Sequence, residues 1–236
     1  MKKVAVIPAR GGSTRLKDKN IHPLGDKPLI RWMTEAVVES ESFDSIIIST
    51  DSDQIFDAVS DLPVERHERP EAHATTKATV LDAMIQLMKT CPKELMGGDD
   101  IFSYFLPTCP FRTSKHIVDG FKLLSRDDFS VVSTTEMQDP IQLSMTIGNN
   151  NIANPEAILN PSHLVTGNTR SQDFETYYRV NGGFYISWLD KFVEKDNFFQ
   201  GITKAYKMSN LNSVDIDYEL DFEWAEYLLK YKHIKL

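Results

Sequence analysis

The chain has little of what membrane-spanning and disulfide-rich secreted proteins need. Its 236 residues contain no apolar stretch that approaches the roughly 20 residues of a membrane-spanning helix. The apolar run at residues 4–7 is too short for a signal peptide and is soon followed by Arg10. The two cysteines, Cys91 and Cys109, form neither a disulfide framework nor a C-x-x-C pair. We therefore expect reduced cysteines in a cytoplasmic protein with no membrane partner.

Several common catalytic and nucleotide-binding motifs are also missing. The chain has neither the P-loop pattern G-x-x-x-x-G-K-[ST] nor G-x-G-x-x-G. It contains no G-x-S-x-G and no H-E-x-x-H, and its six histidines are scattered without the spacing of metal ligands. These absences argue against a nucleophilic triad and against a zinc centre. The net charge of −8 argues against a nucleic-acid partner.

The most informative segment that is present spans residues 4–20 and reads VAVIPARGGSTRLKDKN. Its apolar, β-branched start predicts a buried first strand that stops at Pro8. A Gly-Gly-Ser turn follows at residues 11–13, and glycines let successive backbone N–H groups face one anion. Four cations surround this turn: Arg10, Arg15, Lys17 and Lys19. A glycine turn with cations after a first strand suits the polyphosphate of a nucleotide, and a solvated loop is the alternative interpretation.

The charge of this region differs from that of the rest of the chain. Residues 1–27 contain seven Lys or Arg and two acids, a local charge of +5 in a chain of −8, so the remainder carries −13. Such asymmetry favours a local anion site over a general nucleic-acid surface.

Strand-like and helix-like patterns alternate along the chain. Apolar runs predict further strands at residues 45–50, 101–106, 130–134, 179–187 and 205–208. Amphipathic spacing predicts helices at residues 28–39, 51–62, 79–88, 114–124 and 218–231. The βαβα order predicts an α/β fold with a mostly parallel sheet that is covered on both faces. In such sheets ligands bind beyond the carboxyl ends of the strands, where the first loop lies.

This alternation is lost between residues 138 and 177, a stretch rich in Asn and Pro. A structureless loop of that length is uncommon inside a compact domain. Disorder is one interpretation. We favour an arm that packs on a second copy of the protein, so that residues 1–236 form a single domain with a dimerisation arm at 138–177.

Two acid pairs occur where a strand ends. Asp215 and Asp217 flank Ile216 just before the last helix, and side chains two residues apart in an extended segment point to the same side. Both carboxylates can therefore face one Mg²⁺ ion, which commonly takes one or two carboxylates and completes its shell with water and phosphate oxygens. A helix N-cap is the alternative for Asp217, and helix capping is the favoured interpretation for Asp51 in the second pair, Asp51 and Asp53.

Three other features are weaker on their own. Arg69 precedes Thr75, Thr76 and Thr79, whose hydroxyls can bind a nucleobase edge or a phosphate, or cap a helix. Arg170 can clamp a carboxylate or form an interface ion pair. The Phe198–Phe199 pair marks a contact surface or local burial. A phosphate loop with a metal pair points to nucleotidyl transfer, which needs positioning and charge neutralisation more than a protein nucleophile.

Seven blocks between residues 4 and 221, taken together, resemble the acylneuraminate cytidylyltransferase (CMP-sialic acid synthetase) family. In order, they read IPARGGSTRLKDKN, KPLI, STDSD, ERPEA, LPTCPFR, YYRVNGGFYI and DIDYELD. The resemblance implies a three-layer α/β/α nucleotidyltransferase (Rossmann-like) fold. It also implies that CTP reacts with a nine-carbon 2-keto sugar acid, N-acetylneuraminate or a close relative. The anomeric hydroxyl attacks the α-phosphorus in line, and the products are the CMP-sugar and pyrophosphate.

The resemblance further implies roles for individual residues. The nucleotide-binding positions are Ala9, Arg10, Gly11, Ser13, Arg15, Lys19, Asn20, Arg69 and Thr79. The catalytic set is Arg10, Lys19, Asp215 and Asp217, of which the two aspartates hold Mg²⁺. The sugar-binding positions are Arg170, Asn181, Gly182, Phe198 and Phe199. Among these, Arg170 and the two phenylalanines resemble residues that reach the sugar pocket of the neighbouring subunit in a homodimer.

Two departures from the family pattern leave the sugar open. Leu106 stands where sialate enzymes usually carry a Gln on the sugar side. The arm segment NTRSQD is closer to enzymes of pseudaminic-type sugars, whereas YYRVNGGFYI is closer to sialate enzymes. The base-contact segment ATTKATV also differs, which leaves GTP as an alternative to CTP. The remaining alternatives are pseudaminic acid, legionaminic acid or 3-deoxy-manno-octulosonate as the sugar, or a catalytically silent nucleotide-binding module.

Overall fold

The computed structural model describes residues 1–13, 15–70, 82, 84–87 and 99–231. The chain divides into two compact units, one formed by Met1–Thr134 with Val180–Leu236 and the other by Thr135–Arg179. None of the helices within the described ranges combines the length and the apolar character that a membrane crossing demands.

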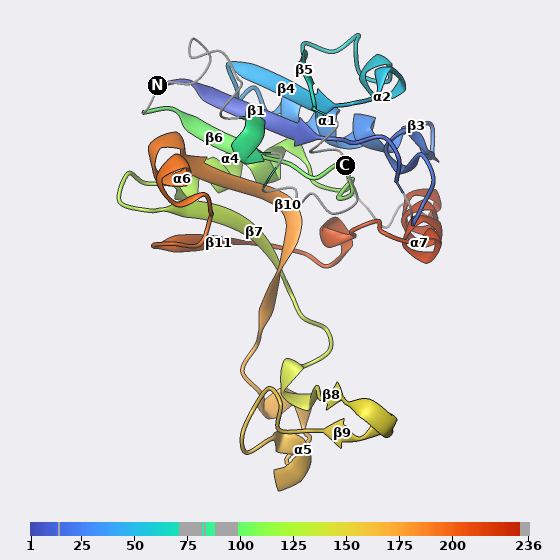
Figure 1. Ribbon diagram of the computed structural model, residues 1–236, viewed down its shortest axis with the longest axis vertical. Coiled ribbons are helices and arrows are strands. Elements are labelled where there is room, and N and C mark those ends of the chain that lie inside the picture. The colour runs from blue at the N-terminus through green and yellow to red at the C-terminus, as the bar shows by residue number, and fades with distance from the viewer. Residues whose placement is uncertain (14, 71–81, 83, 88–98, 232–236) are drawn as a thin grey trace. The chain divides into compact units, whose positions relative to one another are not determined.

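A seven-stranded sheet forms the centre of the first unit (Figure 1). Its strands are β1 (Lys3–Pro8), β4 (Ser45–Thr50), β5 (Glu65–Glu68), β6 (Ile101–Tyr104), β7 (Ser130–Glu136), β10 (Tyr178–Trp188) and β11 (Thr203–Met208). Their order across the sheet is β11-β7-β10-β6-β1-β4-β5. β1 pairs in parallel with both β4 and β6, β4 pairs in parallel with β5, and β10 is antiparallel to β6. The carboxyl ends of the four parallel strands therefore lie at one edge of the sheet.

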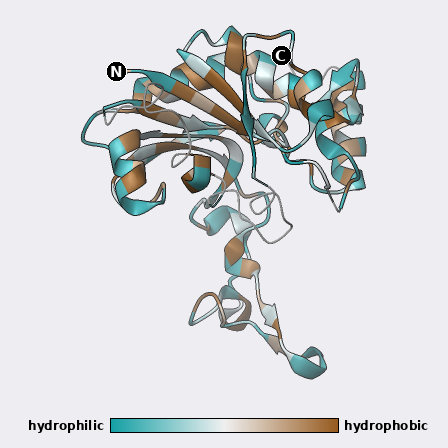
Figure 2. Cartoon of the chain, turned by 45° about the horizontal axis from the view of Figure 1, so that its top comes forward, coloured by the Kyte–Doolittle hydropathy of each residue, from teal (hydrophilic) through white to brown (hydrophobic). Residues whose placement is uncertain are grey.

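Helices cover both faces of this sheet. They are α1 (Leu29–Glu39), α2 (Asp53–Asp57), α4 (Ser114–Leu123) and α6 (Leu189–Lys195), while α7 (Glu219–Lys230) lies apart from them. Ala5 and Ile7 of β1 join a core cluster with α1, α2 and α4, whereas Val4 and Val6 join a second cluster with Phe192 of α6. Adjacent residues of β1 thus pack into two separate cores on opposite faces of the sheet. The predicted three-layer α/β/α fold is confirmed. The central strands are largely hydrophobic, while the helices carry both hydrophobic and hydrophilic residues (Figure 2).

A third apolar cluster joins the two ends of the chain. After the first loop come the short elements η1 (Lys19–Ile21), β2 (Pro23–Leu24) and β3 (Lys27–Pro28). Leu24 and Leu29 pack against Phe222 and Leu228 of α7, and Ile216 belongs to the same cluster. α7 accordingly lies beside the β2–β3 hairpin (Figure 1). This packing brings the acid pair before α7 to the region of the first loop.

The second unit contains only short elements. They are η3 (Ile141–Leu143), β8 (Thr146–Ile147), η4 (Asn149–Asn151), β9 (Ala153–Asn154), α5 (His163–Thr166) and η5 (Ser171–Asp173). It buries few side chains, among them Gln142 and Ser162, and it exposes Met145, Ile147 and Ile152. The segment expected to be an arm, residues 138–177, falls within this unit, and its role in dimerisation stays a prediction.

Most of the expected elements occur close to their predicted positions, and three differences stand out. The predicted helix 51–62 is wrong in length, because α2 ends at Asp57 and turns follow as far as Pro63. β5 and α6 were not expected, since the sequence of β5, ERHE, has no apolar run. The predicted helix 79–88 lies mostly outside the described residues, within which residues 84–87 are helical.

A buried carboxylate fixes the turn that leads into β7. Asp128 accepts hydrogen bonds from the backbone N–H and the hydroxyl of Ser125, each at 2.7 Å, and pairs with Lys204 at 2.8 Å. Burial acts to raise the pKa of Asp128, but the hydrogen bonds from Lys204 and Ser125 outweigh it and lower the pKa to about 2. The ionised form therefore stabilises the fold.

We expect Asp128→Asn to lower the free energy of unfolding by about 1–3 kcal/mol at pH 7. The folded-state pKa lies below the ordinary value of 3.8, so this contribution is present above that value and is lost as the pH falls toward about 2. Urea unfolding at pH 7 and at pH 3 measures the difference. Asp127→Asn, at the exposed neighbouring position, is the matched control. A wild-type advantage that does not shrink at low pH would contradict the assignment.

Candidate active site

The first loop leaves β1 at the carboxyl edge of the sheet and is held by hydrogen bonds on both sides. Ala9 donates its N–H to Ser49 O at 2.9 Å, and the buried Asn20 donates from Nδ2 to Arg10 O at 2.9 Å. Gly12 has a φ of +60°, which favours glycine. A hollow of about 20 Å³ lies among Arg10, Gly12 and Asn20. Because a water molecule alone fills such a space, a phosphate would have to lie over the loop rather than inside it.

Asp51 does not cap α2. The N-cap of that helix is Ser52, and Asp51 Oδ1 accepts the N–H of Gly11 at 2.7 Å. The expectation that Asp51 acts as a helix cap is therefore wrong. The first loop supplies a backbone N–H donor to this carboxylate, and the local sequence did not indicate that contact. The contact ties the first loop to the end of β4.

The basic loop and the acid pair near the C-terminus meet. Lys19 Nζ lies 2.9 Å from Asp217 Oδ1 and donates to Ile216 O at 2.8 Å, although Lys19 and Asp217 are 198 residues apart in the sequence. Arg15 Nη1 lies 3.0 Å from Asp217 Oδ2, and its guanidinium stacks over the ring of Tyr218 at 5.2 Å. Thus one carboxylate binds two cations of the loop.

Asp217 is not a helix N-cap either. Tyr218 occupies the N-cap of α7, and Asp221 accepts the backbone N–H groups of Asp217 and Tyr218 at 2.9 and 2.8 Å. Partial burial acts to raise the pKa of Asp217, but the hydrogen bond and charge of Lys19, with the charge of Arg15, lower it overall. Asp217 is therefore ionised at neutral pH, with one cation of the loop at each carboxylate oxygen.

Asp215, the other member of the pair, lies beside a buried thiol. Cys109 Sγ is 3.8 Å from Asp215 Oδ1 and donates to Asn181 O at 2.9 Å. Burial and the charge of Asp215 raise the pKa of Cys109, so the thiol stays protonated. Between the two aspartates, Ile216 is fully buried and donates its N–H to Thr108 O at 2.9 Å. The segment 106–109 therefore fixes the position of the acid pair.

That segment is in turn held by Arg112, to which the sequence analysis assigned no role. The Arg112 side chain is fully buried, and its Nη2 donates to Leu106 O at 3.1 Å and to Cys109 O at 2.9 Å. Its guanidinium lies 5.3 Å from the centre of the Phe105 ring. Burial lowers its pKa to about 10. Among the described residues, Nε and Nη1 have no hydrogen-bond partner. The one available signal was a lone cation in the otherwise uncharged LPTCPFR block.

The predicted sugar-binding residue Asn181 points into the core. Its Oδ1 accepts from the Ser133 hydroxyl at 2.6 Å and from Gly183 N at 3.0 Å, and its Nδ2 donates to the Ser213 hydroxyl at 2.8 Å. Gly182 has a φ of +70°, and a Cβ there would lie 2.6 Å from Leu106 Cδ1. In the structure these two residues position β10. Their assignment to the sugar stays a prediction.

Phe198 and Phe199 border a cavity of about 280 Å³. Phe198 is buried against Phe192 and Tyr185, whereas the Phe199 side chain is 53% exposed. Tyr104 and Leu106 line the same cavity. Leu106 also belongs to the segment 106–109, whose Cys109 and Thr108 contact Asp215 and Ile216, so the cavity lies near the acid pair.

The remaining predicted residues are placed as follows. Arg69 is buried, donates its N–H to Thr50 O, and has its pKa lowered by burial, with opposing contributions from Asp51 and Tyr104. Ser13 follows Gly12 in the loop and is partly exposed. Thr79 lies outside the described residues. Arg170 belongs to the second unit and is exposed.

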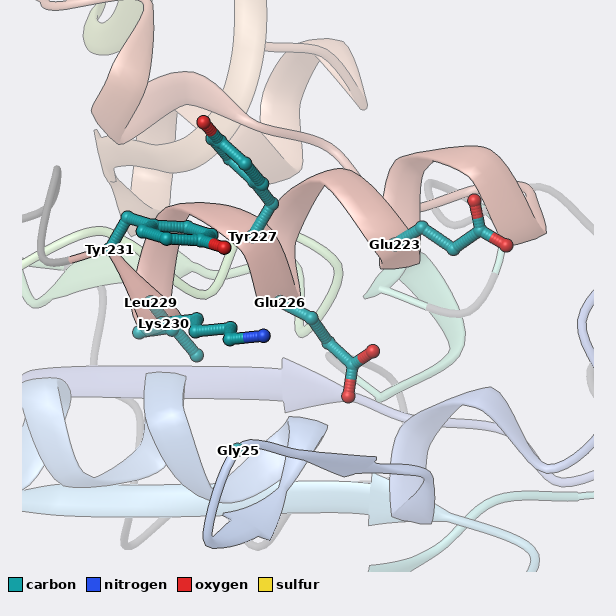
Figure 3. Close-up of a pocket in the computed structure, with 7 residues that line it drawn as sticks. All are labelled: Gly25, Glu223, Glu226, Tyr227, Leu229, Lys230 and Tyr231. Carbon is teal, nitrogen blue, oxygen red and sulfur yellow. The ribbon is translucent and has the colours of Figure 1, made fainter.

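A larger hollow, of about 580 Å³, lies between Gly25 and the outer turns of α7 (Figure 3). Glu223, Glu226, Tyr227 and Lys230 project from the helix around it. None of the predicted site residues lines this hollow. We therefore place the candidate active site at the loop and the acid pair.

A mostly parallel sheet with a basic glycine loop after its first strand, facing an acid pair, is the arrangement expected of a nucleotidyltransferase. The cytidylyltransferase family profile matches residues 4–235, and the chain belongs to the cytidylyltransferase family. The resemblance inferred from the sequence blocks is thereby confirmed.

Similar proteins and solved structures agree with the assignment of the chain to the cytidylyltransferase family. The chain is 30% identical over 231 residues to the N-acylneuraminate cytidylyltransferase of Escherichia coli O18:K1:H7, covering 94% of this chain and 51% of that protein. It is 31% identical over 242 residues to the CMP-N,N'-diacetyllegionaminic acid synthase of Legionella pneumophila, covering 98% and 97%. The chain thus spans about half the length of the E. coli relative. The structure of CMP:2-keto-3-deoxy-manno-octonic acid synthetase complexed with CTP shares the fold, with a TM-score of 0.68, 14% identity and coverage of 98% and 100%.

We expect Asn181→Ala to lower the free energy of unfolding by about 2–4 kcal/mol. The substitution removes one hydrogen bond from each of the Ser133 and Ser213 hydroxyls and the hydrogen bond of the Gly183 N–H to the Asn181 side chain. Urea unfolding measures the change, and Asn149→Ala at an exposed position should shift stability by less than about 0.5 kcal/mol. An Asn181→Ala protein with the wild-type midpoint would show that this network contributes nothing to the fold.

Proposed function

We propose that the chain transfers CMP from CTP to a nine-carbon 2-keto sugar acid, N-acetylneuraminate or a close relative, and releases pyrophosphate. The observation that carries this proposal is the contact of Lys19 with Asp217, which joins a cation-rich glycine loop to a pair of carboxylates. A triphosphate needs the cation-rich loop, and its metal ion needs the pair of carboxylates. Membership of the cytidylyltransferase family and the names of the relatives support CTP and an acidic sugar as substrates.

Different residues of the chain bind different parts of the nucleotide. Arg10, Arg15 and Lys19 bind the triphosphate, together with the backbone N–H groups around Gly11. Arg15 and Lys19 now neutralise Asp217, and a triphosphate carries more charge than one carboxylate, so it competes for the same two cations. Arg69, at the end of β5, binds the nucleotide on the other side of Asp51.

The residues present suit Mg²⁺. Asp215 and Asp217 supply carboxylate oxygens, the donors that this ion prefers, and the buried Ile216 between them keeps both at the edge of the core. Among the described residues no three His, Cys, Asp or Glu side chains gather, so water and phosphate oxygens would complete the shell. When bound, Mg²⁺ would withdraw charge from the phosphate oxygens.

In the reaction, the oxygen of the anomeric hydroxyl forms a bond to the α-phosphorus and gives its proton to water, and the bond from that phosphorus to the oxygen that bridges to the β-phosphate breaks. Pyrophosphate leaves with the electron pair of the broken bond. Lys19 and Arg15 stabilise the negative charge that grows on it, because they are already fixed at the rim of the site.

The sugar itself has more than one candidate. The L. pneumophila relative matches over nearly its whole length, and a pseudaminic acid cytidylyltransferase of Campylobacter jejuni is 26% identical over 242 residues. A panel of CTP and GTP with N-acetylneuraminate, legionaminate, pseudaminate and 3-deoxy-manno-octulosonate, read by pyrophosphate release, separates these candidates. CTP binding without release from any sugar would favour a silent nucleotide-binding module.

We further propose that the enzyme is a cytoplasmic homodimer. Its second unit exposes apolar residues, which suits contact with another copy. CTP as a substrate and a protonated, buried Cys109 suit a reducing compartment that contains nucleotides.

Lys19→Met should reduce kcat/KM for CTP about a hundredfold or more, because it removes a fixed charge from the departing pyrophosphate. Lys17→Met, in the same loop but exposed, is the matched control and should stay within about twofold of wild type. Pyrophosphate release at saturating Mg²⁺ measures both. Equal turnover of the two variants would refute the role of Lys19.

If Arg170 of one subunit serves the site of its neighbour, two inactive variants should complement each other. A mixture of equal amounts of Arg170→Ala and Asp217→Asn, unfolded and refolded together, should regain about one quarter of wild-type activity. Half of the dimers are then mixed, and each mixed dimer has one intact site. Each variant refolded alone is the control. Sedimentation that shows only monomers, or a mixture as inactive as its parts, would exclude a shared site.

A further inference from the structure

The outward side of α7 carries a row of large apolar side chains. The inward side packs Phe222, Ala225 and Leu228 into the core. The members of the outward row are each between 46% and 74% exposed: Leu220, Trp224, Tyr227 and, at the C-cap, Tyr231. Steps of four, three and four residues keep this α7 row on one line along the helix, like the a and d positions of a coiled coil. An apolar row of this regularity marks a contact surface.

The aromatic part of the α7 row is already ordered. The rings of Trp224 and Tyr227 stack with their centroids 5.5 Å apart and their planes at 10°, and the rings of Tyr227 and Tyr231 lie 4.6 Å apart. Rings that are held by one another lose little conformational freedom when a partner covers them. The row therefore presents a preformed apolar face.

The hollow of about 580 Å³ opens beside the α7 row, between the helix and Gly25 (Figure 3). Tyr227 and Tyr231 belong both to the row and to the wall of the hollow. The surface beside the row is therefore concave, and a helix laid along the row can place side chains of its own flank in the hollow.

Charged residues form a second row next to the apolar one. They repeat with the same spacing: Glu219, Glu223, Glu226 and Lys230. Acids occupy the first turn of α7 and Lys230 occupies the last, so the charge changes sign along the helix. Charges that flank an apolar seam decide which helices pair and in which direction. Two copies of α7 therefore pair best antiparallel, because the acidic start of each then lies against the basic end of the other.

The α7 row also matches its own reverse. When two antiparallel copies are related by a two-fold axis at the middle of the helix, Leu220 of each copy faces Tyr231 of the other. In the same arrangement Trp224 faces Tyr227. Large apolar groups then meet in every layer of the seam, and aromatic rings supply most of the contact area.

One ion pair is expected to fix this register. Glu223 of each copy lies two residues, or about 3 Å along the axis, from the position opposite Lys230 of the other, so the two long side chains can meet. The two-fold axis forms the pair twice. This self-complementarity favours a second copy of the chain as the occupant over an unrelated helix.

We propose that α7 forms a two-fold interface between two copies of the chain, with the helices antiparallel and the α7 row at its centre. Since α7 belongs to the first unit, this interface is separate from the dimer contact proposed for the second unit. The helix has 12 residues and is about 18 Å long, so the interface is small and its Kd should be on the order of micromolar. Formation of both contacts would give a tetramer.

Sedimentation equilibrium of the full chain between about 1 and 200 µM tests the interface. Trp224→Glu should halve the largest assembled mass, whether or not the second unit also pairs, because it places a charge in the centre of the seam. Val193→Glu, at an exposed apolar position of α6, is the matched control and should keep the wild-type mass. Circular dichroism checks that both variants fold. A mass that Trp224→Glu leaves unchanged throughout this range would overturn the proposal.

A charge exchange tests the antiparallel register and the identity of the occupant, and it does not depend on how Trp224→Glu folds. Glu223→Lys brings two like charges together and should raise the Kd of association about tenfold. Adding Lys230→Glu to that variant should return the Kd to within about threefold of wild type. Glu194→Lys, at an exposed position of α6, is the control for net charge and should leave the Kd unchanged. A double variant that associates no better than Glu223→Lys alone would show that α7 does not pair with itself in this direction, and would overturn the proposal.

Discussion

The ion pair between Lys19 and Asp217 is the contact on which the rest of the site depends. It connects the first loop with a segment 198 residues later, and the lysine also binds the carbonyl oxygen of Ile216. Apolar packing of α7 on the residues after the loop brings the two segments together, so the charges meet without having to drive the folding. The same pairing relieves repulsion among the loop's cations and keeps them fixed at the place where we propose that the triphosphate binds.

Buried polar groups hold the backbone next to this contact in place. Arg112 holds the carbonyls of Leu106 and Cys109, and Thr108 between them accepts the N–H of Ile216. Within the part of the chain that the structure describes, the buried Arg112 guanidinium is only partly hydrogen-bonded, which is costly for stability, yet it holds the segment that borders both the acid pair and the apolar cavity. A change at segment 106–112 should therefore alter both the phosphate side and the sugar side of the site.

The sequence predicted those features that depend on local pattern. β1 and β4 contain continuous apolar runs, and the glycine loop directly follows β1, so the place of the loop at the carboxyl edge could be inferred. The direction in which a polar side chain points could not be predicted from the sequence. Asp51 was expected to cap a helix but accepts the N–H of Gly11, and the amide of Asn181, whose assignment to the sugar stays a prediction, forms hydrogen bonds within the core. Tyr104 and Tyr185 are brought together by the pairing of β6 with β10, which leaves no local signal in the sequence.

Paramagnetic broadening of backbone amide signals by Mn²⁺, added with CTP in place of Mg²⁺, tests most directly whether the loop and the acid pair share one ligand. We predict that the signals of Gly12 and of Asp217 both broaden, and that Asp217→Asn abolishes the broadening of both. Broadening confined to one of the two segments, or undiminished in Asp217→Asn, would contradict a shared metal–triphosphate complex.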